Sequence, residues 1–114
     1  MIEQMTVGEL RALLDEKPEQ FAFWQVVDVR EPWEVERASI KHKHFKHTHI
    51  PMATIPLRLQ DLDKSKRILV MCRTGGRSTQ VANFLLQSGF SNVYNLQGGI
   101  TAWSREVDPS VPTY

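Results

Sequence analysis

An apolar strand, a glycine turn and an amphipathic helix follow one another between Arg67 and Gly89. Residues 68–72 are five apolar residues in a row, bounded by charged residues and glycines, and this length favours a buried strand over a helix. Gly89 supplies a left-handed end for the helix that follows. The inner stripe predicted for this helix consists of Val81, Phe84, Leu85 and Ser88. This arrangement is typical of sheets whose parallel strands alternate with helices.

The rest of the chain repeats the alternation. A capping box of Thr6 and Glu9 predicts a first helix that ends before Pro18. Strands are expected at residues 24–29 and 92–96, and shorter helices at 32–37 and 57–62. A last helix is expected to bury Ile100, Trp103 and Val107, and Trp24 and Trp33 are also expected in the core. The sequence therefore predicts an α/β fold with a parallel sheet and helices on both of its faces.

Size and charge limit the classes of function. The chain has 114 residues, enough for a single domain spanning 1–114. Fourteen basic and 13 acidic residues leave a net charge of +1, so neither nucleic acid nor a membrane surface is an expected partner. The chain begins without a signal-like or membrane-spanning stretch. A single cysteine excludes an internal disulfide, and we expect a cytoplasmic protein with a free thiol.

The residues after the apolar strand carry the predicted chemistry. Cys72 ends that strand, at the edge of a parallel sheet where ligands usually bind. The loop that follows consists of Arg73, Thr74, Gly75, Gly76, Arg77 and Ser78. The two glycines allow backbone N–H groups to converge, the helix N-terminus adds positive potential, and the two arginines add donors for an anion. We therefore expect Cys72 to react as a thiolate, although a buried cysteine is by itself more often a small apolar core residue.

Three motifs resemble those of the rhodanese family. The loop Cys72–Ser78 is similar to its active-site loop, Val27–Glu31 resembles its Asp-x-Arg-Glu motif, and Asn95–Ile100 with Trp103 resembles its closing Gly-Gly-x-x-x-Trp element. This resemblance implies a rhodanese-like fold, with a central, mostly parallel sheet of five strands. It also implies a persulfide intermediate on Cys72. Neither a cofactor nor a metal is expected.

The reaction implied by the resemblance is a double displacement. Cys72 takes sulfur from a small anionic donor, for which thiosulfate suits two arginines, and yields it to a thiol, sulfite or cyanide. Arg73–Ser78 and Arg30 are the expected substrate-binding residues, with Asp28 in support; a salt bridge between Asp28 and Arg30 that braces the loop is an equal alternative. Two other functions stay open: a sulfur relay to a protein acceptor, and a phosphatase or arsenate reductase. The second is disfavoured because only four residues separate Cys72 from Arg77, whereas those relatives use five.

Residues 41–49 are expected to form a polar loop rich in histidine and lysine. Its histidines, at 42, 44, 47 and 49, alternate as metal ligands on an extended segment can, but no cysteine or carboxylate lies among them, and a solvated loop is preferred. The family's Gly-His-Ile-Pro-Gly-Ala segment is similar to residues 48–53, where both glycines are replaced, or else aligns near residues 38–40. No role is assigned to His49.

Overall fold

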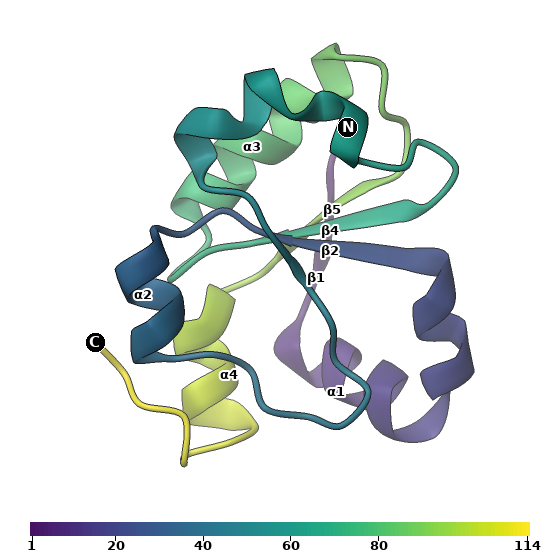
Figure 1. The fold of residues 1–114 in the computed structure, drawn as a ribbon. Helices are drawn as coiled ribbons and strands as arrows, with labels where there is room; N and C mark the ends of the chain where they lie inside the picture. Colours follow the sequence, from purple (N-terminus) through teal and green to yellow (C-terminus); the bar gives the residue numbers. More distant parts are fainter.

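All five strands lie parallel in one sheet. The computed structural model describes residues 1–114, and the order of strands across the sheet is β1-β5-β4-β2-β3 (Figure 1). β4 therefore lies in the centre, paired on one side with β2 and on the other with β5. The strands are β1 (Glu3–Met5), β2 (Trp24–Asp28), β3 (Thr48–His49), β4 (Arg67–Met71) and β5 (Val93–Leu96). The predicted α/β fold with a parallel sheet of five strands is confirmed.

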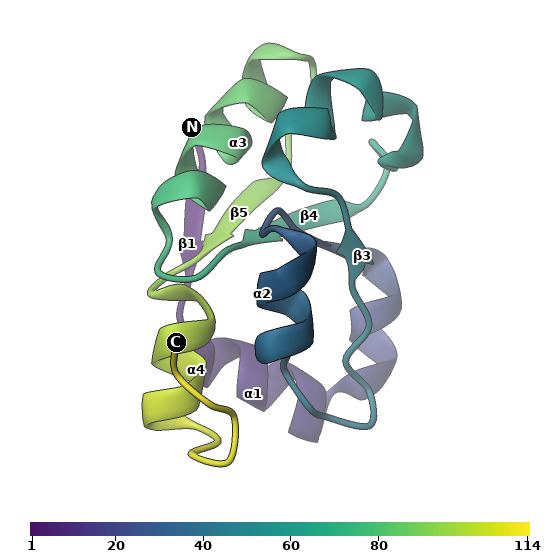
Figure 2. The ribbon, with the colours of Figure 1, turned by 60° about the vertical axis from the view of Figure 1, so that its left-hand side comes forward.

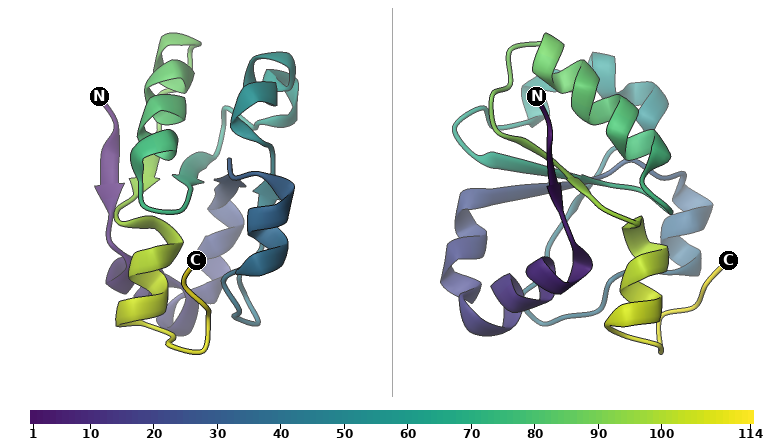
Figure 3. Two further views of the ribbon diagram at one scale, coloured as in Figure 1. Left: turned by 90° about the vertical axis from the view of Figure 1, so that its left-hand side faces the viewer. Right: turned by 180° about the vertical axis from the view of Figure 1, so that it is seen from behind.

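Helices cover both faces of the sheet, also as predicted. In Figure 1, α3 and the 3₁₀ helices of residues 52–57 and 59–61 lie above the strands, whereas α1 and α4 lie below them. Figure 3 shows the same division from two further sides. The helices are α1 (Val7–Glu16), α2 (Pro32–Arg37), α3 (Gly76–Gln87) and α4 (Gly99–Glu106), and the 3₁₀ helices are η1 (Pro18–Phe23), η2 (Met52–Leu57) and η3 (Leu59–Asp61). None of these helices has the length and apolar character needed to cross a bilayer.

The central strand supplies side chains to both layers of the core. Ile68, Val70 and Cys72 belong to the apolar cluster between the sheet and α3. Leu69 and Met71 belong to the cluster between the sheet and helices α1 and α4. Each of these five residues is at most 1% exposed. Successive side chains of a strand point to opposite faces, so a strand covered on both sides must be apolar throughout. Full burial of each such side chain contributes about 2 kcal/mol to the free energy of folding, so burial of these side chains favours a central position for β4 in the sheet.

Local signals in the sequence set the ends of several helices. The Thr6 hydroxyl accepts the N–H of Glu9 at 3.1 Å, and the Glu9 carboxylate accepts the N–H of Thr6 at 2.8 Å, which completes the predicted capping box. Pro32 occupies the first turn of α2, where a missing N–H has no cost. Gly89 has a φ of +96°, the left-handed conformation expected just beyond α3.

Some boundaries and placements differ from the predictions. Strands β1 and β3 were not expected, because three and two residues are too few to show an alternating pattern. Thr48 and His49 form β3, so the predicted polar loop at 41–49 ends in a strand paired with β2. Helix α3 begins at Gly76 rather than near Ser78. The expectation that Trp33 lies in the core is wrong, since it is 61% exposed.

Candidate active site

Cys72 lies at the carboxyl edge of the sheet, between two helices. It directly follows β4, and the loop of residues 72–78, here called the Cys72 loop, leads into the first turn of α3 (Figure 2). Its neighbour β5 leads at the same edge into α4. In parallel sheets this edge is where ligands bind, because loops and helix N-termini gather there. The sequence placed the cysteine correctly, within one residue of the strand end.

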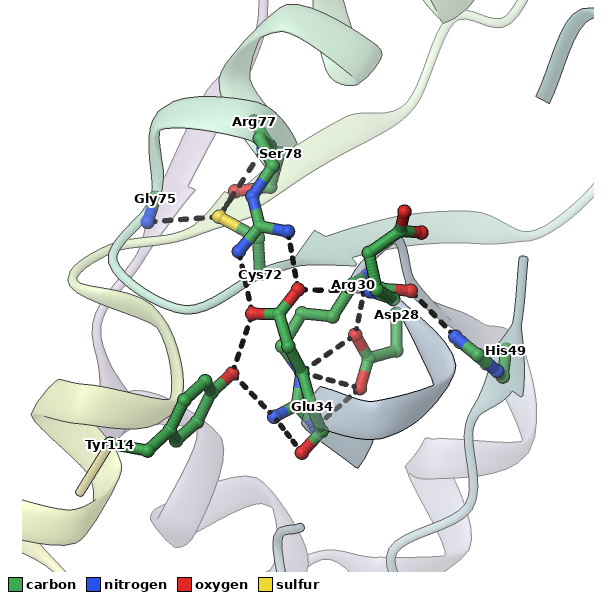
Figure 4. A network of polar contacts seen from close by, with 10 residues as sticks. Asp28, Arg30, Glu34, His49, Cys72, Gly75, Arg77, Ser78 and Tyr114 are labelled. Carbon is green, nitrogen blue, oxygen red and sulfur yellow. Dashed lines mark hydrogen bonds and ion pairs between the residues drawn. The ribbon is translucent and has the colours of Figure 1, made fainter. Parts of the chain in front are cut away.

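The Cys72 sulfur accepts hydrogen bonds from its own loop. The N–H of Gly75 lies 3.1 Å from Sγ, the N–H of Ser78 lies 3.4 Å away, and the Ser78 hydroxyl lies 3.3 Å away (Figure 4). Gly75 has a φ of +109°, a conformation that glycine adopts without strain and that turns its N–H inward. The loop thus aims two N–H groups at a single sulfur atom, with the Ser78 hydroxyl beside it. Such donors stabilise negative charge on that sulfur.

The first turn of α4 fixes the other side of the loop. The N–H of Ile100 donates to the carbonyl of Cys72 at 3.1 Å, and the N–H of Thr101 donates to that of Arg73 at 3.0 Å. Gly99 makes this contact possible, because a Cβ there would lie 2.5 Å from the Cys72 carbonyl oxygen. The closing Gly-Gly element of the sequence is therefore part of the site. The sequence did not predict this contact, because Gly98 and Gly99 lie far from Cys72 along the chain.

A polar chain extends from Cys72 into the sheet. The Ser78 hydroxyl donates to the side-chain oxygen of Asn95 in β5, and the Asn95 amide donates to Gln4 at 2.9 Å. Ser78 is fully buried and Asn95 is 4% exposed. Buried polar groups need such partners, so this series of hydrogen bonds fixes the orientation of the Ser78 hydroxyl beside the sulfur. Sequence analysis missed both Asn95 and Gln4 as site residues, since each follows from strand pairing alone.

The two arginines of the loop have different surroundings. Arg77 forms a bidentate ion pair with Glu34 of α2, with nitrogen–oxygen distances of 2.6 and 2.8 Å. The Arg73 guanidinium has no carboxylate partner and lies 4.8 Å above the ring of Tyr114. Arg73, Thr74 and Gly76 are exposed to solvent, whereas Cys72 is only 1% exposed. The loop therefore presents side chains to solvent and holds its sulfur just beneath them.

Glu34 connects Arg77 to the C-terminal segment. The Tyr114 hydroxyl donates to the Glu34 carboxylate at 2.9 Å and accepts from Arg30 at 2.9 Å (Figure 4). The Arg77 guanidinium lowers the pKa of Glu34 to about 2, against the opposing effect of burial. Glu34 is thus a buried carboxylate that stays ionised. Glu34 and Tyr114 were both missed from the sequence, because neither lies in a motif with the cysteine.

Asp28 and Arg30 form the base of this network. Three guanidinium–carboxylate contacts of 2.8–3.1 Å join the two side chains, and both residues are fully buried. A third donor of Arg30 reaches the main-chain oxygen of Glu34 at 3.2 Å. The structure brings Arg30 into contact with the residues that orient Arg77. This is the bracing salt bridge that the sequence left as one of two alternatives.

The four histidines do not gather at one point: the rings of His42 and His44 lie 5.8 Å apart, whereas His47 and His49 have other neighbours. His42 lies 2.7 Å from Asp15, His49 lies 2.6 Å from the main-chain oxygen of Arg30, and the ring of His47 packs 5.7 Å from that of Phe45. Burial lowers the pKa of His47. No three residues of the metal-binding types gather anywhere in the structure. Of the two segments that could match the family's His-Ile-Pro motif, the one at 48–53 contains β3 beside β2.

Comparison with known proteins assigns the fold to a family. The family model of the rhodanese-like domain matches residues 6–106. The Arabidopsis thaliana protein named Rhodanese-like/PpiC domain-containing protein 12, chloroplastic, is 46% identical over 99 residues; this covers 79% of the chain but only 30% of that relative. A protein of Allochromatium vinosum named Sulfurtransferase is 37% identical over 86 residues, which are 75% of this chain and 77% of that one. The crystal structure of a rhodanese-like domain protein from Staphylococcus aureus superposes with a TM-score of 0.75 and 31% identity over 99% of both chains. The chain belongs to the rhodanese-like domain family.

Proposed function

We propose that this protein is a sulfurtransferase that moves sulfane sulfur from thiosulfate to a thiol, sulfite or cyanide through a persulfide on Cys72. One observation carries the proposal: the Cys72 sulfur accepts the N–H groups of Gly75 and Ser78 at the N-terminus of a 12-residue helix. Relatives named as sulfurtransferases support the same reaction class. A lone cysteine needs a reducing compartment to stay free, so we propose the cytoplasm as its location.

The first half-reaction loads the cysteine. The Cys72 thiolate attacks the outer sulfur of thiosulfate, a new S–S bond forms, and the old S–S bond breaks with its electron pair leaving on sulfite. The product is a persulfide with a negative outer sulfur. In the second half-reaction the acceptor attacks that outer sulfur, and the electron pair of the S–S bond returns to Cys72. Charge and atoms balance without any cofactor.

The Cys72 loop has further donors for the outer sulfur. The N–H groups of Gly76 and Arg77 open helix α3 and have no acceptor within the protein. Together with the N–H groups already on the cysteine sulfur, they form a cradle for one additional atom. Thr74 borders this cradle on its exposed side. Arg77 is held by Glu34, which leaves it less free to encircle a tetrahedral phosphoryl group.

The arginines then divide the work of binding the donor. Arg73 is exposed and has no ion-pair partner, so we assign it the sulfonate oxygens of thiosulfate. Arg77 supplies positive potential beside Cys72, whose charge contributes to raising the pKa of Arg77 after the larger effect of Glu34. Asp28 and Arg30 support Glu34 and are not assigned to the donor, because all three guanidinium nitrogens of Arg30 already bind Asp28, Glu34 or Tyr114.

Intact-protein mass spectrometry tests the reaction class. Mixed with thiosulfate, the wild-type chain should gain the mass of one sulfur atom, and cyanide should remove it. The Cys72→Ser variant should gain nothing; it is a clean control because the chain has no other cysteine. A wild-type chain that stays unmodified, or one that hydrolyses a phosphate ester through Cys72, would refute the proposal.

A relay to a protein acceptor is the second candidate. Trp33 is 61% exposed and packs edge-on against Tyr114, whose ring in turn contacts Arg73. An exposed tryptophan next to the site is a common anchor in protein interfaces. A relay would form the persulfide readily and turn over slowly with cyanide and small thiols. Fast turnover with a small acceptor would exclude it.

A further inference from the structure

A cleft of about 380 Å³ lies beside the Cys72 loop. Three parts of the chain form it: the exposed side of that loop, helix α4 and the C-terminal segment. Its lining residues are Arg73, Thr74, Thr101, Arg105, Thr113 and Tyr114. Neither Cys72 nor the residues 75–78 line it, so the cleft adjoins the sulfur cradle without containing it.

Apart from the Tyr114 hydroxyl, which pairs with Arg30 and Glu34, the side-chain polar groups of this cleft form no hydrogen bond or ion pair within the protein. Four of the eight arginines of the chain pair with carboxylates, namely Arg11, Arg30, Arg58 and Arg77. Arg73 and Arg105, from two different elements, form neither an ion pair nor a hydrogen bond, and Arg73 is held in place over the Tyr114 ring. The hydroxyls of Thr74, Thr101 and Thr113 make no hydrogen bond either. Two cations and three hydroxyls therefore face one space with no acidic side chain in its lining.

This set of donors fits an anion with several oxygen atoms. Guanidinium groups bind carboxylates in a bidentate manner, and threonine hydroxyls can donate to the lone pairs of the carboxylate oxygens that remain free. To act as an acceptor, a ligand bound in this cleft must also reach the cradle. A carboxylate joined to a thiol by a short flexible arm can stay in the cleft while the thiol lies at the outer sulfur. Thiosulfate is too compact to occupy both places.

We propose that the Arg73–Arg105 cleft binds the carboxylate of a small anionic thiol and thereby selects the sulfur acceptor. This inference rests on the proposed function and names the acceptor class. The bound thiolate attacks the outer sulfur of the Cys72 persulfide, a new S–S bond forms on the acceptor, and the old bond breaks with its electron pair on Cys72. The positive charge of Arg105 raises the local concentration of the anionic acceptor without touching the reacting atoms.

Acceptor selectivity tests the proposal. Glutathione, 2-mercaptoethanol and cyanide are compared as acceptors for the thiosulfate-loaded protein. In Arg105→Gln, the ratio of kcat/KM for glutathione to that for 2-mercaptoethanol should fall about fivefold through KM, as expected for one exposed ionic contact. The matched control is Arg37→Gln, which removes an exposed, unpaired arginine at the end of α2 and should leave the ratio unchanged. An unchanged ratio in Arg105→Gln, or a rise in the KM for thiosulfate instead, would overturn the proposal.

Direct binding separates this proposal from the proposed function. S-methylglutathione keeps both carboxylates and cannot accept sulfur, so calorimetry with it needs no persulfide. Binding to the wild-type protein that weakens about fivefold in Arg105→Gln supports the cleft even if thiosulfate fails to load Cys72. Normal loading of Cys72 with no binding of S-methylglutathione refutes the cleft alone.

Discussion

The two terminal nitrogens of Arg77 lie 2.6 and 2.8 Å from the two carboxylate oxygens of Glu34, and this ion pair ties the first turn of α3 to α2. The Glu34 side chain is only 4% exposed, whereas that of Arg77 is 36% exposed. Loss of Arg77 would leave a buried carboxylate without its main partner, while loss of Glu34 would leave a cation that solvent can reach. The pair therefore fixes the position of a positive charge beside Cys72.

We predict that acid destabilises the protein partly through Glu34. Its pKa is lowered from 4.5 to about 2 in the folded state, so its contribution is complete above pH 4.5 and is lost as the pH falls towards 2. With allowance for the solvent exposure of Arg77, the loss is about 1–2 kcal/mol. Urea unfolding at several pH values between 2 and 6 measures it.

In this series, Glu34→Gln should show a shallower fall in the free energy of unfolding than the wild type. Glu36→Gln, on an exposed position of the same helix, serves as the control and should keep the wild-type slope. Equal slopes in the wild type and Glu34→Gln would show that the ion pair contributes nothing to stability.

Ser78→Ala should slow the loading of Cys72. Its hydroxyl lies 3.3 Å from the sulfur, and its single proton can turn from Asn95 to the thiolate when Cys72 ionises, so its removal should lower the rate about fivefold. Single-turnover persulfide formation with thiosulfate gives this rate directly. Ser88→Ala removes a hydroxyl at the other end of α3, where it donates to a main-chain oxygen, and should leave the rate unchanged. Equal rates for both variants would remove Ser78 from the mechanism.

Gly99→Ala should destabilise the protein by about 2–3 kcal/mol. The added Cβ would lie 2.5 Å from the Cys72 carbonyl oxygen, and the φ of +60° is unfavourable for alanine. Chemical denaturation measures the loss. The control is Gly8→Ala in helix α1, where the nearest atom is 3.9 Å away and alanine should stabilise the helix. A stable Gly99→Ala protein would mean that α4 and the Cys72 loop do not pack as described.

The sequence was most informative where one local pattern sufficed. The apolar run of β4, the capping box at Thr6 and the glycine at 89 each depend on neighbours in the chain, and all three were confirmed. Cys72 was placed at the sheet edge for the same reason, because strand, turn and helix are consecutive.

Contacts between distant segments could not be predicted in this way. Glu34 and Tyr114 meet at a distance of 80 residues along the chain, and Gln4 reaches Asn95 across 91 residues through the pairing of β1 with β5. The expectation that both loop arginines add donors for an anion took no account of Glu34. A buried carboxylate requires a cation, and Arg77 is the one that the fold brings to it.

The Cys72 loop is held in two ways: α4 donates to the carbonyl groups of Cys72 and Arg73, and the N–H groups of Gly75 and Ser78 donate to the Cys72 sulfur. We expect a frame fixed in this manner to keep its shape when a sulfur atom is added to Cys72. In the proposed reaction, forward and reverse transfer pass through the same transition state, so the protein would accelerate both alike. Under the proposed function, the concentrations of donor, acceptor and products would therefore set the net direction of sulfur flow, and an excess of sulfite would drive the loaded cysteine back towards thiosulfate.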